Sequence, residues 1–317
     1  MGPESAPEGF TTQGMTHPFN APADDYDREF TSTRLGRWLR EPVWRRLDSG
    51  FGPGDTVLEL GCGTGADAVW LAGRGVRVVA TDVAPAMLEL ARRKVMEAGV
   101  TASVAFRVVD INNLPAWTPA LTFDGLLSNF GALNCVSDCR SLARTAAGWV
   151  RPGGRVVLVV MGPFCPWEMV WHLLHGDIRT ALRRLRSGGT AHIGAGASVP
   201  VWYPSPQRLR SQFAPFFRHV ETVGLGVLLP PTYLQHVVER WPTFFKRLAA
   251  LEGSWRSRFP WTLLNDHYLM VLERRGNRPE PLTRYAAAFE PGGEVRDAGW
   301  LPPQPSEGGL MIPEKRP

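Results

Sequence analysis

The sequence lacks the long apolar runs and the paired cysteines that mark membrane-spanning and disulfide-bonded proteins. In its 317 residues, apolar runs such as residues 156–161 are far shorter than the roughly 20 residues of a membrane span, and no signal-peptide core follows Met1. The four cysteines form no CxxC pair and have no histidine at zinc-ligand spacing: Cys62, Cys135, Cys139 and Cys165. We therefore expect a soluble, cytoplasmic protein with reduced thiols, no membrane span and no bound metal.

Lysine is also scarce, and the net charge of +5 comes almost entirely from arginine. Most arginines are scattered, but four of them gather in one segment: Arg179, Arg183, Arg184 and Arg186. Arg179, Arg183 and Arg186 fall on one stripe of a predicted helix, and Ile178, Leu182 and Leu185 fall on another, which predicts a solvated arginine face. Binding of an anionic substrate group is the alternative. Nucleic acid is disfavoured as a partner, because no basic-aromatic module accompanies the cluster.

The most informative stretch is a short apolar run, residues 57–60, followed by glycines at alternate positions, Gly61, Gly63 and Gly65. The run predicts a buried strand, and residues 66–71 predict the start of a helix. Between them the backbone must bend sharply and let a ligand approach closely, which side chains would prevent. The pattern therefore predicts a nucleotide-binding turn, against the alternative of an ordinary glycine-rich turn.

Two acidic residues follow the next two predicted strands. Residues 76–81 lead into Asp82, and residues 104–109 lead into Asp110. A carboxylate after the second strand of such a unit can accept hydrogen bonds from both ribose hydroxyls. Either acid alone would suit a helix cap or a solvated loop, but acids at two successive strand ends favour a nucleotide site.

In this context the loop resembles the first motif of class I S-adenosylmethionine-dependent methyltransferases of the small-molecule type. The resemblance covers about residues 23–275 and implies S-adenosyl-L-methionine as cofactor. It implies that Asp82 binds the ribose, that Asp110 binds the adenine amino group, and that an early Tyr26-Asp27 pair closes over the methionine end. The cofactor-binding residues expected on this basis are Tyr26, Glu59, Gly61, Cys62, Gly63, Gly65, Asp82, Val83, Asp110, Ile111 and Asn129.

Two other functions fit parts of the pattern. A nicotinamide-dependent dehydrogenase is the closest alternative in the same fold, because the loop also matches G-x-G-x-x-A. Glu59 and Gly65, however, belong to the methyltransferase form of the loop, and Asp110 has no standard dehydrogenase role. The alternative from another class is a catalytically inactive S-adenosylmethionine-binding partner or regulatory protein, which the intact glycines and acids disfavour.

Alternating strand and helix patterns predict an α/β fold: a Rossmann-like, doubly wound, seven-stranded sheet with helical lid insertions. The four further strands are expected at residues 123–128, 155–160, 217–228 and 266–273, and the resemblance makes the last of them antiparallel. Helices are expected at residues 84–98 and, capped by Ser137, up to Val150.

The chain is expected to have three parts. A flexible N-terminal segment (1–20) precedes a methyltransferase domain (21–275), and a Pro/Gly-rich tail (276–317) follows it. The domain starts with a helical cap (21–50), interrupted near Pro42, and contains lid insertions at 162–215 and 230–265. Both insertions are rich in aromatic residues, which indicates a bulky, largely apolar acceptor; the alternative is that these residues form a helical subdomain's core.

Methyl transfer mainly requires alignment of an acceptor lone pair with the sulfonium methyl and exclusion of water, so a dedicated base is optional. If the acceptor must lose a proton, His172 is the first candidate base, with His175 and Tyr203 next; each would otherwise be a packing residue. No Asn-Pro-Pro-Tyr motif follows the fourth strand, which argues against methylation of DNA bases. The residues expected to bind a small-molecule acceptor are Phe130, Asn134, Trp171, His172, Trp202 and Tyr203.

Overall fold

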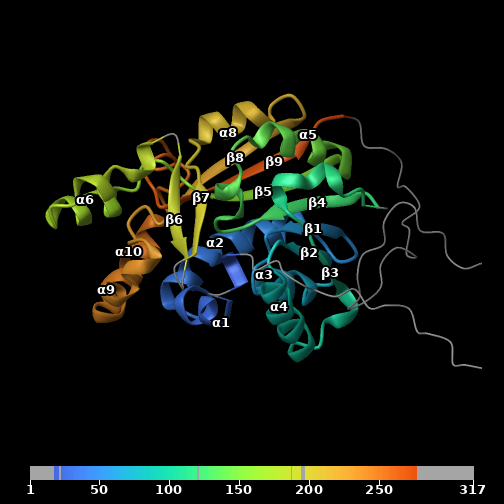
Figure 1. Ribbon diagram of the computed structural model, residues 1–317, viewed down its shortest axis with the longest axis horizontal. Coiled ribbons are helices and arrows are strands. Elements are labelled where there is room, and N and C mark those ends of the chain that lie inside the picture. Colours follow the sequence, from blue (N-terminus) through green and yellow to red (C-terminus); the bar gives the residue numbers. More distant parts are fainter. Residues whose placement is uncertain (1–17, 21–22, 120, 187, 194–196, 277–317) are drawn as a thin grey trace, which may run out of the picture.

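A seven-stranded sheet runs through the centre of the protein, in the order β3-β2-β1-β4-β5-β9-β8 (Figure 1). This computed structural model describes residues 18–20, 23–119, 121–186, 188–193 and 197–276. The strands of the sheet are β1 (Thr56–Leu60), β2 (Arg77–Asp82), β3 (Val104–Val108), β4 (Phe123–Ser128), β5 (Val150–Met161), β8 (Phe217–Leu225) and β9 (His267–Arg274). The first five are parallel, and β9 is antiparallel to both of its neighbours. The predicted fold class is confirmed.

The central strands are apolar on both faces because helices cover both sides of the sheet. All of β1 is buried, with Val57 packed in one layer and Leu58 in the other. The first layer contains α2 (Arg34–Gly50), α3 (Ala66–Ala72) and α4 (Pro85–Glu97), and the opposite layer contains α5 (Cys139–Trp149) and α8 (Pro206–Phe213). The carboxyl ends of the parallel strands therefore meet at one edge, where this architecture places ligands.

Helix α2 forms most of the predicted N-terminal cap. It begins after Thr33, whose hydroxyl accepts a hydrogen bond from the backbone N–H of Gly36 at 2.9 Å. The helix continues through Pro42, so the predicted interruption is wrong. A proline removes one helical hydrogen bond, but burial of the apolar face that includes Leu39 and Val43 offsets this loss.

Strand and helix positions agree with the sequence predictions to within a few residues, with three differences at the ends. Strand β5 begins at Val150, five residues before its predicted start at residue 155. Strand β8 stops at Leu225, because Gly226 turns the chain with a φ of +67°. Helix α5 is capped by Asp138 and not by Ser137: the Asp138 carboxylate accepts a hydrogen bond from the N–H of Arg140 at 3.1 Å.

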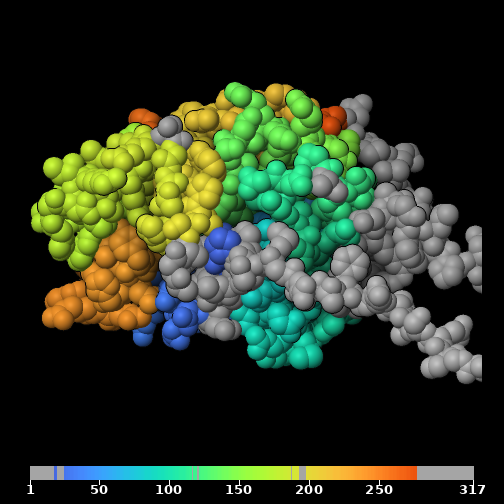
Figure 2. Space-filling model, in the orientation of Figure 1, coloured from blue at the N-terminus to red at the C-terminus, as the bar shows by residue number. Residues whose placement is uncertain are grey.

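Two insertions leave the same end of the sheet and adjoin each other (Figures 1 and 2). The first contains α6 (Pro166–Leu174), α7 (Ile178–Ala181) and an antiparallel hairpin of β6 (Gly189–Ile193) and β7 (Ala197–Val201). The hairpin was not predicted. The second contains α9 (Gln235–Arg240) and α10 (Pro242–Glu252). Trp167 of α6 and Phe245 of α10 pack with ring centroids 6.0 Å apart, so the insertions share a core.

Short elements complete the described chain. They are α1 (Ala23–Tyr26), the π-helical turn η2 (Asp27–Thr31) and the 3-10 turns η1 (Pro18–Asn20), η3 (Thr101–Ser103), η4 (Ile111–Ala116), η5 (Ala132–Cys135), η6 (Arg183–Leu185) and η7 (Thr232–Leu234). Residues 1–17 and 277–317, which make up most of the two predicted terminal segments, lie outside the described residues.

All four cysteines are free thiols. Of the helices that the structure describes, none is long and apolar enough to cross a membrane. The described residues also contain no group of three or more His, Cys, Asp or Glu side chains that could hold a metal ion.

Candidate functional site

The glycine-rich loop joins β1 to α3, and its three glycines have positive φ: +71° at Gly61, +52° at Gly63 and +76° at Gly65. A Cβ at Gly61 would lie 2.3 Å from the Cβ of Ala132, and one at Gly65 would lie 2.7 Å from the Cβ of Ala91. A Cβ at Gly63 would meet nothing within 4 Å. Two glycines thus allow close packing, while the third leaves the backbone open to a ligand.

Asp82, the last residue of β2, braces this loop. Its Oδ2 accepts a hydrogen bond from the backbone N–H of Gly63 at 2.9 Å, and its Oδ1 accepts one from the N–H of Ala84 at 2.9 Å. The Asp82 carbonyl also accepts the N–H of Val109 at 3.0 Å, which holds the ends of β2 and β3 together. Asp82 is buried, and Val83 beside it is half-buried. A carboxylate therefore lies against the loop backbone, where the ribose contact is predicted.

Asp110 lies at the end of the neighbouring strand. Its Oδ1 accepts a hydrogen bond from the N–H of Asn112 at 2.8 Å, so it caps the turn η4. Asp110 is exposed and Ile111 is half-buried. Asp110 therefore caps a turn, which was one of the alternatives considered from the sequence. Its contact with adenine stays a prediction.

A small cavity of about 30 Å³ lies between the loop, the N-terminal helices and the end of β4. Its lining residues come from four separate segments: Tyr26, Arg40, Gly61, Cys62, Gly63, Thr64, Ala66, Asp67, Asn129 and Phe130. The structure thus brings together Tyr26, the loop and the end of β4, as expected. Four of the lining residues were not predicted: Arg40, Thr64, Ala66 and Asp67.

A buried ion pair forms the floor of the site. Arg40 Nη1 lies 2.8 Å from Asp67 Oδ2, and both side chains are about 5% exposed. Asp67 also accepts hydrogen bonds from Trp44 Nε1 at 2.7 Å and from Asn129 Nδ2 at 2.8 Å. Burial alone would lower the pKa of Arg40, but the Asp67 carboxylate outweighs it and keeps the guanidinium charged. This network ties α2, α3 and the end of β4 into one unit.

Burial raises the pKa of three titratable groups of the site. Burial and the nearby Asp67 raise the pKa of Glu59 well above its usual value, and Glu59 Oε2 has no hydrogen-bond partner in the described chain. Burial likewise raises the pKa of the Cys62 thiol well above its usual range and that of Tyr26 to about 12. Cys62 is therefore a neutral packing group, because a nucleophilic cysteine must be a thiolate.

The two residues of the predicted Tyr-Asp pair, Tyr26 and Asp27, make different contacts. Tyr26 lines the cavity, whereas Asp27 binds the loop and α4. Thr64 Oγ1 donates to Asp27 Oδ1 at 2.7 Å, and Lys94 Nζ lies 2.5 Å from Asp27 Oδ2 and 2.8 Å from Thr64 Oγ1. These three side chains hold the N-terminal cap against the glycine loop.

Phe130 forms the wall of the cavity beyond β4. It has a φ of +42°, an uncommon conformation for a residue with a side chain. Its ring packs edge-on against Phe30 at 4.9 Å and against His267 at 5.3 Å between centroids, and the Arg40 guanidinium lies 5.3 Å from its centroid. The strained backbone thus directs the ring between the cofactor loop and the start of β9.

The other residues predicted near β4 lie beside the hairpin. Asn134 is fully buried, and its Nδ2 donates to the carbonyls of Met161 at 3.1 Å and Trp202 at 2.7 Å, while its Oδ1 accepts the N–H of Met161 at 2.9 Å. Its side chain therefore binds backbone. Trp202 is half-buried, and Tyr203 lies under the Arg184 guanidinium at 5.5 Å. Burial raises the pKa of Tyr203.

The predicted residues of α6 pack against α9 and η7, and none of them lines the cavity. Trp171 lies 4.6 Å from the His175 ring and 6.4 Å from the His236 ring. His172 Nε2 lies 3.2 Å from the Tyr233 hydroxyl, and His175 is exposed, with Nδ1 bonded to the Trp171 carbonyl at 2.7 Å.

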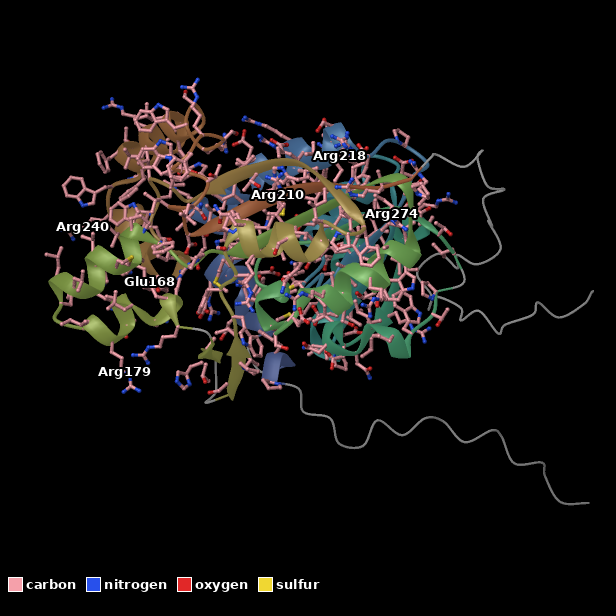
Figure 3. All side chains as sticks on the ribbon, turned by 90° about the horizontal axis from the view of Figure 1, so that it is seen from above. Glu168, Arg179, Arg210, Arg218, Arg240 and Arg274 are labelled. Carbon is pink, nitrogen blue, oxygen red and sulfur yellow. The ribbon has the colours of Figure 1, made fainter. Side chains whose placement is uncertain are left out.

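The arginine cluster differs from its prediction. The predicted stripe of Arg179, Arg183 and Arg186 is exposed. The helix ends at Ala181, however, and Ile178 of the predicted apolar stripe is 61% exposed, so the predicted continuous amphipathic helix is wrong. Arg184, on neither stripe, is buried because of a buried acid: Arg183 Nη2 and Arg184 Nη2 lie 2.8 Å and 2.9 Å from Glu168 Oε2. Figure 3 shows Glu168 directed inward at the base of α6 and Arg179 projecting outward.

Arg184 also connects this cluster to β9. Its Nη2 lies 2.7 Å from Asp266 Oδ1, and His267 Nδ1 lies 2.9 Å from Asp266 Oδ2. All three side chains are buried. A chain of ion pairs therefore runs from Glu168 through Arg184 to Asp266, and Asp266 in turn contacts the imidazole of His267, which packs on Phe130.

Comparison with known proteins finds similarity to methyltransferases. A family model described as a methyltransferase domain matches residues 57–154. The chain is 30% identical over 212 residues to a demethylmenaquinone methyltransferase of Symbiobacterium thermophilum, covering 62% of this chain and 80% of that protein. It is 34% identical over 192 residues to one of Mycobacterium sp. (strain KMS), covering 58% and 76%. A crystal structure of an S-adenosylmethionine-dependent methyltransferase from Clostridium acetobutylicum shares the fold, with a TM-score of 0.52 and 11% identity over 80% of this chain and 98% of that one.

Proposed function

Because the chain belongs to the class I S-adenosylmethionine-dependent methyltransferases, we propose that it transfers a methyl group to a bulky, largely apolar small molecule. The observation that carries this proposal is the cavity beside the glycine loop, which has a buried ion pair at its floor and the aromatic rings of Tyr26 and Phe130 in its wall. Polar groups on one side suit a cofactor, and an aromatic wall suits an apolar acceptor.

S-adenosylmethionine is the cofactor of this family, and when bound it supplies a methyl group activated by a sulfonium. The residues of the site fit this molecule. The open backbone at Gly63 and the carboxylate of Asp82 suit its ribose. Asn129 Oδ1 is buried without a hydrogen-bond partner among the described residues, so it is an acceptor for the ammonium group of the methionine end.

An aromatic acceptor is supported by the two insertions and by the relatives. Rings of both insertions pack together, as in the Trp167–Phe245 pair, at the end of the sheet where the glycine loop lies. The two relatives reported above are named for a quinone acceptor, demethylmenaquinone. A quinol or phenol is therefore the first acceptor class to test. In this proposal, residues 21–275 form the methyltransferase domain, and residues 162–203 together with the cap around Tyr26 form the acceptor pocket.

The cofactor is tested by calorimetry with S-adenosylhomocysteine, with and without a chelator. We expect micromolar or tighter binding that the chelator does not change. Tight binding of NADH without a response to S-adenosylhomocysteine would contradict the assignment.

The acceptor is tested with labelled S-adenosylmethionine and a short-chain demethylmenaquinol, and then with a metabolite extract. Trp171→Ala is expected to reduce methyl transfer while changing S-adenosylhomocysteine affinity by less than about threefold, or 0.6 kcal/mol. A wild-type rate and KM in this variant would move the acceptor pocket to residues 230–265. Cofactor binding without transfer to any component would favour the alternative of an inactive cofactor-binding partner.

A further inference from the structure

We propose that His267 is the base that takes a proton from a hydroxyl group of the acceptor, with Asp266 as its positioning residue. This inference rests on the proposed methyl transfer and adds to it the group that activates the acceptor. It also narrows the acceptor to a molecule with an ionisable hydroxyl, such as a phenol or a quinol.

The position of His267 places it at the reactive edge of the sheet. It is the first residue of β9, which runs antiparallel, and it pairs with Met161 at the carboxyl end of β5 and with Leu225 at the end of β8. The glycine loop and Asp82 lie at the same edge. The His267 ring contacts Phe130, which lines the cavity, with centroids 5.3 Å apart. One aromatic ring thus separates the imidazole from the cavity, and in this proposal the acceptor extends past Phe130 to reach it.

Asp266 determines which ring nitrogen carries the proton. Its Oδ2 lies 2.9 Å from His267 Nδ1, and its Oδ1 lies 2.7 Å from Arg184 Nη2. Burial alone would raise the pKa of Asp266, but His267 and Arg184 outweigh it and hold that pKa well below its usual range. An ionised carboxylate accepts from Nδ1–H, so the neutral ring keeps its lone pair on Nε2.

The surrounding charges suit a base that gains and then loses a proton. Asp266, the residue before the strand, stabilises the imidazolium, while Arg184 and, across Phe130, Arg40 of α2 oppose it. Glu168 of α6 offsets the charges of Arg183 and Arg184. The remaining titratable groups near Asp266 and Arg184 are kept neutral by burial, which raises their pKa values: Cys165, Tyr203 and Tyr233.

The step balances without a further reactant. His267 Nε2 takes the proton of the acceptor hydroxyl, and the resulting oxyanion supplies an electron pair from its oxygen or from a conjugated ring carbon. That pair forms a bond to the methyl carbon while the carbon–sulfur bond breaks and its electrons pass to sulfur. The products are the methylated acceptor and S-adenosylhomocysteine, and the imidazolium returns its proton to water. With a carbon nucleophile, the ring proton leaves as the ring becomes aromatic again and the oxygen takes a proton back, so that one proton is released overall.

The other histidines of the insertions are less suited to this role. His172 is engaged with the Tyr233 hydroxyl at 3.2 Å, and His175 is an exposed residue at the end of α6. Neither contacts a residue that lines the cavity in the way that His267 contacts Phe130.

A first experiment needs no acceptor. Nitrogen-15 NMR of the imidazole rings, in full-length protein bound to S-adenosylhomocysteine and with His267→Asn used for assignment, reports which nitrogen of His267 is protonated. We expect the neutral ring to carry its proton on Nδ1. A neutral ring protonated on Nε2 would overturn the proposal whether or not an acceptor has been found.

A second experiment uses short-chain demethylmenaquinol as the probe. His267→Asn keeps a donor near Asp266 but removes the base, so kcat should fall by about 100- to 10,000-fold. S-adenosylhomocysteine affinity should change by less than about threefold. The pH dependence of the wild-type kcat should be lost in the variant.

The matched control is His219→Asn in β8. His219 is half-buried, and it bonds to Thr222 near the start of the strand, away from the cavity. It should keep the wild-type kcat and pH profile. A wild-type kcat in His267→Asn would overturn the role of His267 alone. Absence of transfer by the wild type would instead count against a quinol acceptor, and the NMR result would then decide the role of His267.

Discussion

Arg40 and Asp67 form an ion pair of 2.8 Å inside the protein, although 27 residues separate them in the sequence. The pair joins the N-terminal helix to the helix that follows the glycine loop. Its carboxylate also accepts from Asn129 at the end of β4. The ion pair at the floor of the cofactor site therefore also holds α2, α3 and the end of β4 together.

Asp67→Asn should strongly destabilise the protein. The amide keeps an acceptor for Trp44 but leaves the charge of Arg40 buried without a counterion, which costs about 3–5 kcal/mol. Urea unfolding at pH 7 measures this change. The matched control is Asp25→Asn, which breaks an ion pair with Arg28 whose side chains are 51% and 74% exposed; it should cost no more than about 1 kcal/mol. Equal losses in both variants would refute a special role for the buried pair.

Asp82→Ala should weaken S-adenosylhomocysteine binding by about 10- to 100-fold. The variant loses charge-assisted hydrogen bonds of about 1.5–3 kcal/mol each, and 1.4 kcal/mol corresponds to tenfold in affinity. Calorimetry measures the change, and circular dichroism checks that the fold survives. Unchanged affinity with an unchanged melting curve would mean that Asp82 serves only the loop.

The control for Asp82 is another carboxylate that bonds backbone, at the opposite edge of the sheet. Asp124 Oδ2 accepts the N–H of Thr56 at 2.8 Å, and its Oδ1 accepts from Arg151 Nε at 2.7 Å. Asp124→Ala should therefore reduce stability and leave S-adenosylhomocysteine affinity unchanged. A parallel loss of affinity would show that the Asp82 effect is general destabilisation.

The sheet and the loop could be predicted from the sequence because their signals are local. Apolar runs that end in Asp82 and Asp110, and glycines that take positive φ, are read within a few neighbouring positions. The strand that carries His267 was predicted nearly to its first residue, since it too is a continuous apolar run. The antiparallel direction of this strand was predicted only from the resemblance, because antiparallel pairing produces no local pattern in the sequence.

The buried Arg40–Asp67 and Arg184–Asp266 ion pairs could not be predicted, because each joins segments that are far apart in the chain. Arg184 and Asp266 are 82 residues apart, and only the folded sheet brings them together. One signal was available: Glu168 is a single acid in an apolar helix, where a charge is costly unless it is paired. The same reasoning applies to Asp67 in the apolar start of α3. An isolated charge among apolar residues is thus evidence for a partner, although not for its identity.

Lys94→Met should loosen the N-terminal cap. The variant removes the contacts of Lys94 with Asp27 and Thr64 while keeping an apolar stem of similar length. Because both charged side chains are more than a quarter exposed, stability should fall by no more than about 1 kcal/mol. A looser cap should speed release of S-adenosylhomocysteine by about 3- to 10-fold, as measured by stopped-flow fluorescence. Lys246→Met, on the exposed surface of α10, is the control and should leave the release rate unchanged.

Acid should destabilise the protein through Glu168 and Asp266. Burial alone would raise the pKa of each carboxyl, but Arg183 and Arg184 lower that of Glu168, and His267 and Arg184 lower that of Asp266. A folded-state pKa below the unfolded value, about 4, contributes stability that is present above pH 4–5 and is lost as the pH falls further. Urea unfolding at several pH values between 7 and 3 should show a loss of about 2 kcal/mol or more.

Glu168→Gln tests whether this cluster causes the acid sensitivity. The amide cannot be ionised, so the variant should be less stable than the wild type at pH 7, where Arg183 and Arg184 lose the charge of Glu168, and the difference should shrink as the pH falls. Glu239→Gln, an exposed carboxyl in the second insertion, is the matched control and should follow the wild-type curve. If Glu168→Gln ran parallel to the wild type at every pH, the protonation of Glu168 would not contribute to acid unfolding, and the sensitivity would have to come from Asp266 or from carboxyls elsewhere.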